Sequence, residues 1–132
     1  MQMPRPNPDV LMRKAELVRR LHAFLPSDSV ISDPVETKAY ECDGLSAYRC
    51  PPMAAVLPRS TQEVAAVLKL CHEMNVPVVP RGAGTSLAGG ALPTADSLIL
   101  GVARMNDVLE TDYENRVIKV QTGRTNLSVT GA

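Results

Sequence analysis

The spacing of apolar residues divides the chain into an N-terminal helical part and a longer part built of short strands and helices. In the first part, apolar side chains recur at helical spacing up to about Leu25, after Asn7, which can cap a helix, and Pro8, which suits its first position. This pattern predicts one helix within residues 1–29, the N-terminal arm and helix. The apolar face that we expect it to bury consists of Leu11, Ala15, Val18, Leu21 and Leu25.

After an irregular stretch between Pro26 and Pro52, the pattern becomes that of a buried strand. Residues 53–57 are apolar throughout, which is typical of a strand covered on both faces, although periodicity alone does not exclude a helical segment. Ser60 and Glu63 then form a capping box, so a helix is expected to begin there.

The predicted helix carries an apolar stripe at positions 64, 67, 68 and 71, and Asn75 suits a left-handed helix end. Residues 76–79 form a second short apolar strand. A strand, a packed helix and another strand make a βαβ unit with two parallel strands. The segment after residue 79 is therefore expected to leave the carboxyl end of a parallel strand, where open α/β sheets bind ligands. Further strands are predicted over 97–102, 108–110 and 117–121.

The segment at that carboxyl end is a glycine-rich loop, Pro80–Pro93, which holds half of the chain's eight glycines. Glycines permit a positive φ and a close approach, so successive backbone N–H groups can converge on an anion. Hydroxyl and guanidinium groups in the same loop add donors. The predicted binding residues for a diphosphate are Pro80, Arg81, Gly82, Ala83, Gly84, Thr85, Ser86, Gly89 and Gly90. A glycine-rich loop taken alone is equally compatible with a simple tight connection.

Two common nucleotide-binding motifs do not fit this loop. The dinucleotide fingerprint GxGxxG requires a third glycine where Leu87 stands. The NTP-binding P-loop requires Lys and Ser or Thr where Gly90 and Ala91 follow Gly89. A diphosphate cradle without a metal-binding residue or a catalytic lysine suits a cofactor that is held intact.

Composition excludes several other classes of function. Fourteen basic side chains balance fourteen acidic ones, and there are only four aromatic residues, so nothing favours a nucleic-acid partner. Three cysteines without a CxxC pattern, and two histidines far apart in sequence, predict neither a disulfide framework nor a metal site. No apolar run is long enough to span a bilayer and the N-terminus does not read as a signal peptide, so a cytoplasmic location is the default expectation.

The loop Pro80–Pro93, together with Val56–Val64 before it, resembles the flavin-binding domain of the vanillyl-alcohol oxidase superfamily. Within that superfamily, Tyr40–Arg49 and Ala103–Asn106 resemble the FAD-linked subunits of bacterial glycolate oxidases. The resemblance covers about residues 30–132 and implies an α+β fold, of which this chain would form the first subdomain: a βαβ core with parallel strands flanked by helices. The chain ends soon after a helix is expected to begin near Thr125, so it reads as truncated.

The resemblance also implies a cofactor and a reaction. FAD would lie with its diphosphate wrapped by the loop. Related enzymes that bind flavin covalently often carry a histidine where this chain has Thr85, so non-covalent FAD is expected. The whole enzyme would oxidise a 2-hydroxy acid such as glycolate or lactate to the 2-oxo acid, with a second flavin-type subunit and an iron–sulfur subunit as partners. Through them it could lie at the periphery of the inner membrane.

Several questions stay open at this level. No catalytic residue is assigned, because neither His22 nor His72 is linked to the loop, and the roles of Asp43, Ser46 and Tyr48 are undecided. A non-catalytic nucleotide-binding or partner-docking module is an alternative, as is a fragment of a flavin reductase of cell-wall precursor synthesis. A chain that forms only the first subdomain exposes the apolar surface that would pack against the rest of the enzyme. We therefore expect the isolated chain to self-associate.

Overall fold

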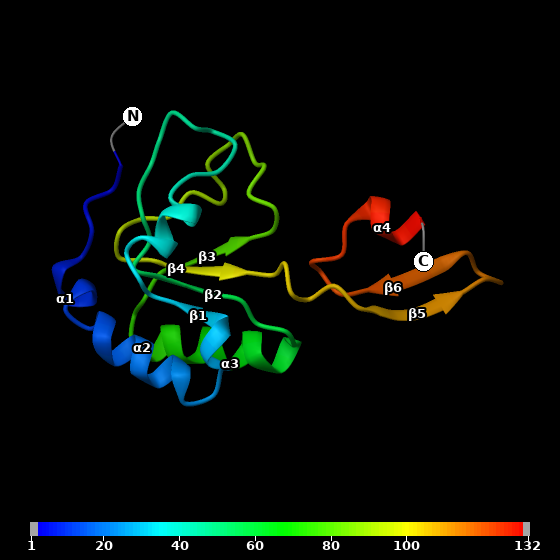
Figure 1. Ribbon diagram of the computed structural model, residues 1–132, viewed down its shortest axis with the longest axis horizontal. Helices are drawn as coiled ribbons and strands as arrows, with labels where there is room; N and C mark the ends of the chain where they lie inside the picture. Colours follow the sequence, from blue (N-terminus) through cyan, green and yellow to red (C-terminus); the bar gives the residue numbers. More distant parts are fainter. Residues whose placement is uncertain (1–2, 131–132) are drawn as a thin grey trace.

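The computed structural model describes residues 3–130 and places a four-stranded sheet in the larger of two lobes (Figure 1). The sheet order is β1-β2-β4-β3, in which β1 is antiparallel to β2 and the other neighbours are parallel. The strands are β1 (Val30–Ile31), β2 (Ala54–Val56), β3 (Val78–Arg81) and β4 (Leu98–Gly101). Two short 3₁₀ helices, η1 (Ser27–Ser29) and η2 (Glu36–Tyr40), flank β1.

The N-terminal helix differs from the prediction in two ways. It is divided into α1 (Pro8–Leu11) and α2 (Lys14–His22) by a break at Arg13, whose backbone is not helical. The break rotates the buried face, so that Val10 and Leu17 enter the core while Leu11 stays 37% exposed. The predicted face was therefore wrong at its start and correct at Leu21 and Leu25, which are buried. The cap at Asn7 is confirmed, because its side chain accepts a hydrogen bond from the N–H of Asp9 at 3.0 Å.

The helix between β2 and β3, α3 (Thr61–Glu73), begins and ends where the sequence predicts. The Ser60 hydroxyl accepts from the N–H of Glu63 at 3.2 Å. The Glu63 carboxylate reaches one residue further than in a standard capping box, to the N–H of Arg59 at 2.7 Å. Asn75 has a φ of 51°, the left-handed conformation that ends a helix.

The two strands of the predicted βαβ unit are parallel, but they are not neighbours. Strand β4 lies between them and pairs with both, with Leu98 opposite Ala54 on one side and Val78 on the other. Strand β3 is thereby at the edge of the sheet, which accommodates Pro80, because an edge strand does not need every N–H for pairing. The carboxyl ends of β2, β3 and β4 share one side of the sheet, as parallel strands require.

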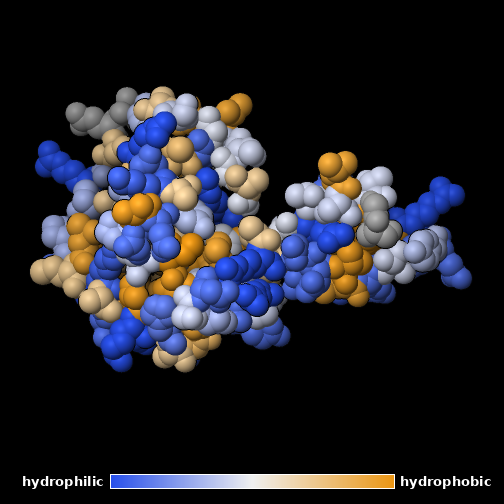
Figure 2. Space-filling model, in the orientation of Figure 1, coloured by the Kyte–Doolittle hydropathy of each residue, from blue (hydrophilic) through white to orange (hydrophobic). Residues whose placement is uncertain are grey.

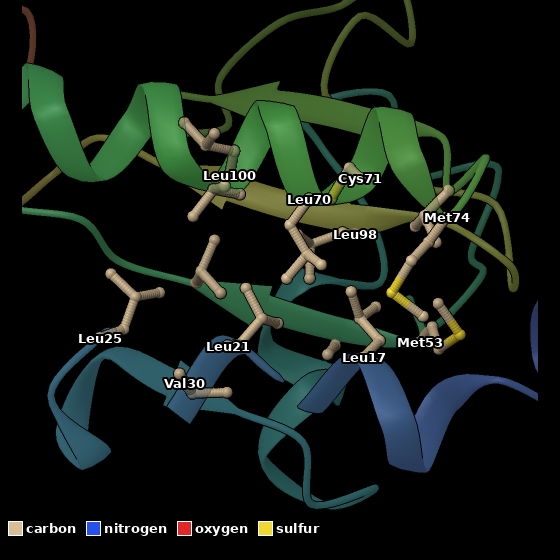
Figure 3. Packing of buried hydrophobic residues seen from close by; sticks show 14 of the residues in the cluster. Leu17, Leu21, Leu25, Val30, Met53, Leu70, Cys71, Met74, Leu98 and Leu100 are labelled. Carbon is tan, nitrogen blue, oxygen red and sulfur yellow. The ribbon is translucent and has the colours of Figure 1, made fainter. Parts of the chain in front are cut away.

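Helices α2 and α3 cover one face of the sheet and enclose the core (Figures 1 and 3). Side chains from α2, α3 and the sheet meet in one buried cluster, which includes Leu17, Leu21, Val56, Val67, Leu70, Cys71, Leu98 and Leu100. The stripe predicted for α3 was correct at Val67 and Cys71 and wrong at Leu68, which is 46% exposed, while Leu70 is buried in its place. On the other face of the sheet, Ala55 and Ile99 are also fully buried, so the prediction of strands covered on both sides is confirmed.

The smaller lobe is a hairpin of β5 (Val108–Asp112) and β6 (Val117–Val120), followed by the short helix α4 (Asn126–Thr130). Asp112 closes the predicted turn by accepting from the N–H of Asn115 at 2.9 Å. Within residues 3–130 the hairpin pairs with no strand of the larger sheet. Figure 2 shows apolar side chains on the surface of this lobe. In the hairpin, Leu109 is 55% exposed and Val117 is 57% exposed. No helix in the described residues is long and apolar enough to cross a membrane.

These exposed side chains support the prediction that the isolated chain self-associates. A two-stranded hairpin is marginally stable by itself and its open edges can pair with another chain. We expect the mean mass in sedimentation velocity to rise with protein concentration, and the double substitution Leu109→Lys, Val117→Lys to suppress the rise. A wild-type chain that stays monomeric across the concentration range would contradict this expectation.

Candidate functional site

The glycine-rich loop joins the carboxyl end of β3 to β4 and has the backbone of an anion cradle. Gly84 and Gly89 adopt positive φ values of 72° and 75°. The N–H groups of residues 83–87 donate no hydrogen bond within the described residues. Consecutive N–H groups without internal partners, in a loop with left-handed glycines, can converge on an anion. The residues present therefore fit the diphosphate of a dinucleotide cofactor such as FAD.

The Arg81 side chain holds the loop in place through contacts inside the protein. Its Nη1 donates to the carbonyl of Cys42 at 2.7 Å and to the carbonyl of Ala91 at 3.5 Å, and its guanidinium lies 5.7 Å from the ring centre of Tyr40. A Cβ built on Gly84 would run into the same guanidinium. Arg81 thus joins both ends of the loop to the segment after η2, and much of its donor capacity is used inside the protein. Its predicted contact with a diphosphate stays a prediction.

The turn at Asp43 and Gly44 supports the loop from the other side. The Asp43 carboxylate accepts from the N–H of Leu45 at 2.9 Å, which is ordinary turn chemistry. A Cβ on Gly44 would lie 2.8 Å from the carbonyl oxygens of Thr85 and Ser86, so only glycine permits this close approach. The structure gives the segment Asp43–Gly44 a packing role that its sequence did not reveal.

The remaining predicted residues lie along the loop in two groups. Gly82 and Ala83 line a cleft of about 530 Å³, whereas Gly89 lines a separate hollow of about 270 Å³ together with Tyr48. Ser86 accepts from the N–H of Ala88 at 3.3 Å, so its hydroxyl stabilises the bend between the two groups. Thr85 and Gly90 are exposed, Pro80 belongs to β3, and Ser46 is exposed on the neighbouring turn.

The rest of the lining of the 530 Å³ cleft comes from residues that the sequence analysis did not assign to the site. Ala103 and Asn106 lie in the link between β4 and β5, and Thr122, Gly123 and Arg124 follow β6. Arg104, in the link between β4 and β5, donates to the Asp28 carboxylate at 2.9 Å. This ion pair holds the link against the segment at η1. Burial disfavours ionisation of Asp28, but the charges of Arg104 and Arg59 outweigh it and hold the pKa of this carboxyl below its usual range.

The two histidines do not line the cleft beside the glycine loop. His22 and His72 are exposed on α2 and α3, away from the glycine loop's lining residues, and no group of three potential metal ligands occurs among residues 3–130. Burial raises the pKa of the Cys71 thiol to about 11, so it is a core thiol and no nucleophile at neutral pH. The site as described can hold an anionic group and position it.

Comparison with protein families agrees with this geometry. Residues 52–130, more than half of the chain, match the model of the FAD binding domain. The chain belongs to this family. The match begins just before β2 and includes the glycine loop, both walls of the cleft and the hairpin.

Relatives in the family act on 2-hydroxy acids, according to their names. Glycolate oxidase subunit GlcD of Escherichia coli K12 is 41% identical over 95% of this chain and 25% of its own length. D-lactate dehydrogenase of Anaerostipes hadrus is 35% identical over 82% of this chain and 23% of its own length. Mitochondrial D-2-hydroxyglutarate dehydrogenase of Bos taurus is 40% identical over 71% of this chain and 17% of its own length. The chain spans at most about a quarter of each relative's length.

Solved structures confirm the fold class. Alkyldihydroxyacetonephosphate synthase superposes over 98% of this chain and 25% of its own, with a TM-score of 0.79 and 24% identity. p-Cresol methylhydroxylase superposes over 96% of this chain and 25% of its own, with a TM-score of 0.80 and 22% identity. The fold is that of the vanillyl-alcohol oxidase-type FAD-binding domain, as the resemblance of the glycine loop implied.

Proposed function

We propose that the loop from Pro80 to Gly90 binds the diphosphate of FAD, held non-covalently, in a flavoprotein that oxidises a 2-hydroxy acid to a 2-oxo acid. The observation that supports the proposal most directly is the run of free N–H groups over residues 83–87, which includes Gly84 and ends two residues before Gly89. These groups would donate to the phosphate oxygens, while the positive φ at Gly84 and Gly89 gives the loop its curvature.

The substrate class follows from the relatives. The named substrates glycolate, D-lactate and D-2-hydroxyglutarate share a hydroxyl group next to a carboxylate. FAD supplies the acceptor for the two electrons that such a hydroxyl carbon gives up on oxidation. This chain's residues would bind and orient the cofactor, and the groups that contact the hydroxy acid would come from outside residues 1–132.

The expected partners are a second flavin-type subunit and an iron–sulfur subunit that carry the electrons onward. The support is the name of the GlcD relatives, each of which is a subunit of glycolate oxidase. A cytoplasmic location, with attachment to the inner membrane through those partners, belongs to the same proposal.

The test is a titration of the 132-residue chain with FAD, FMN and riboflavin, followed by flavin fluorescence. FMN and riboflavin lack the diphosphate, so saturable binding of FAD with at least tenfold weaker binding of the other two would support the loop as a diphosphate cradle. Equal binding of all three would contradict it. Oxidation of glycolate and D-lactate with a dye as electron acceptor, measured on any longer gene product that contains the chain, tests the reaction.

The non-covalent state of FAD gives a separate prediction. Thr85 is exposed and carries only a hydroxyl, so the loop offers no imidazole at the position where related enzymes often attach flavin. We expect acid or urea to release all of the flavin from the FAD-loaded protein, leaving the unmodified mass of the polypeptide. A flavin adduct that survives denaturation in mass spectrometry would show a covalent link and contradict the prediction.

A further inference from the structure

The cleft beside the glycine loop is lined by one charged residue, which comes from the segment after β6. The cleft has a volume of about 530 Å³, and among the residues that line it Arg124 alone carries a charge. No carboxylate lines this cleft. The loop supplies Gly82 and Ala83 on one side, and the segment after β6 supplies Arg124 on the other. The end of β3 and the segment after β6 both lie on the side where the chain passes from the larger lobe to the hairpin (Figure 1).

The Arg124 guanidinium is fixed but its charge is not neutralised. Nη1 donates to the carbonyl of Asn106 at 3.1 Å and Nη2 to the carbonyl of Ser128 at 3.0 Å. Nε is buried and has no hydrogen-bond partner in the part of the chain that the structure describes. Within the same residues, no carboxylate forms an ion pair with Arg124. A guanidinium has five N–H donors, so this side chain keeps donors for an anion.

The backbone holds Arg124 at this position. Gly123 donates from its N–H to the carbonyl of Met105 at 2.7 Å, and a Cβ at Gly123 would collide with the carbonyl oxygen of Val102. The turn after β6 is therefore packed directly on the link after β4. A side chain placed by two carbonyls and by a glycine contact loses little conformational entropy when it binds a ligand.

The other arginines near the cleft are engaged elsewhere. Arg59 and Arg104 both pair with Asp28 at 2.9 Å, and Arg81 donates to the carbonyl of Cys42 and does not line the cleft. An FAD diphosphate carries two negative charges, which the neutral N–H groups of the loop leave uncompensated. Arg124 lines the same cleft as Ala83, the first residue of that run of N–H groups, so it is positioned to supply a positive charge there.

We propose that Arg124, from the segment after β6, binds the diphosphate of the dinucleotide in the cleft that Gly82 and Ala83 also line, so that the phosphates contact both segments. The proposal rests on the proposed FAD binding and adds a contact from a segment some forty residues further along the chain. Arg81 is then a positioning residue that shapes the loop, and Arg124 is the residue that contacts the anion.

The experiment compares Arg124→Gln, Arg124→Lys and the control Arg116→Gln, each titrated with FAD, ADP and inorganic pyrophosphate. Gln keeps a donor but removes the charge, Lys keeps the charge, and Arg116 is an exposed arginine of the hairpin turn outside the cleft. We expect Arg124→Gln to weaken binding of all three ligands by about tenfold to a hundredfold, the value of charge-assisted hydrogen bonds. Arg124→Lys should lose less, and Arg116→Gln should bind like the wild type.

A salt titration separates an electrostatic contact from a structural one. The affinity of the wild type and of Arg124→Lys for ADP should fall with rising salt, and Arg124→Gln should show a shallower fall. Circular dichroism confirms that each variant is folded, and if Arg124→Gln does not fold, the Arg124→Lys variant and the wild-type salt dependence carry the test. A wild-type affinity that salt does not change would overturn the proposal.

The remaining outcomes distinguish this proposal from the proposed function. Equal FAD affinities of Arg124→Gln and Arg116→Gln, with wild-type binding intact, would overturn the role of Arg124 and leave FAD binding standing. Binding of ADP and pyrophosphate that depends on Arg124, without saturable binding of FAD, would support the anion site and contradict the proposed function. A wild-type chain that binds none of the three ligands would overturn both.

Discussion

Replacing Gly84 by alanine should destabilise the protein by about 1–2 kcal/mol and weaken FAD binding at least about tenfold. The backbone at Gly84 has a φ of 72°, which costs any residue with a Cβ about 1–2 kcal/mol. The new Cβ would also collide with the Arg81 guanidinium, which is held by the carbonyls of Cys42 and Ala91. Moving Arg81 releases the loop from the segment after η2 and changes the direction of the N–H groups proposed to bind phosphate.

The matched control for the stability effect is Gly90→Ala in the same loop. A Cβ at Gly90 meets only the Ser86 hydroxyl at 3.6 Å, which is an ordinary contact, and φ there is not in the left-handed region. We expect its free energy of unfolding to change by less than about 0.5 kcal/mol. Urea denaturation gives the stability of both variants, and flavin fluorescence gives the FAD affinity of Gly84→Ala. Equal losses of stability in the two variants would show that the strain at Gly84 is not the cause.

The features that the sequence predicted correctly are those decided by residues close together in the chain. The Ser60 cap and the left-handed Asn75 depend on hydrogen bonds and dihedral angles within one helical turn. The glycine loop was located in the same way, because its four glycines lie within nine residues of each other. Its binding of a diphosphate stays a prediction. The resemblance to a known family then gave the fold and the cofactor, which periodicity alone could not.

The features that were missed depend on contacts between distant segments. The insertion of β4 between β2 and β3 is a question of sheet order, which a βαβ pattern does not contain. The contact of Gly44 with the carbonyls of Thr85 and Ser86, and the cleft wall at Arg124, join segments about forty residues apart. Gly123 was a usable signal, because a glycine beside a strand often marks a close backbone approach. The segment that it approaches could not be identified from the sequence.

The second large effect is expected where the helical pattern and the structure disagree about α3. The pattern assigned Leu68 to the buried stripe, whereas the structure buries Leu70, 4% exposed, against β4 and leaves Leu68 46% exposed (Figure 3). Leu70→Ala should lower the free energy of unfolding by about 2–4 kcal/mol, because it removes buried methyl groups and leaves a cavity. Leu68→Ala removes the same atoms from the same helix and should cost less than about 1 kcal/mol, since its side chain is already half in water. Urea denaturation of the two variants decides between the two assignments. A larger loss of unfolding free energy for Leu68→Ala than for Leu70→Ala would mean that α3 is rotated about its axis. The packing of Cys71 and Val67 against the sheet would then have to change as well.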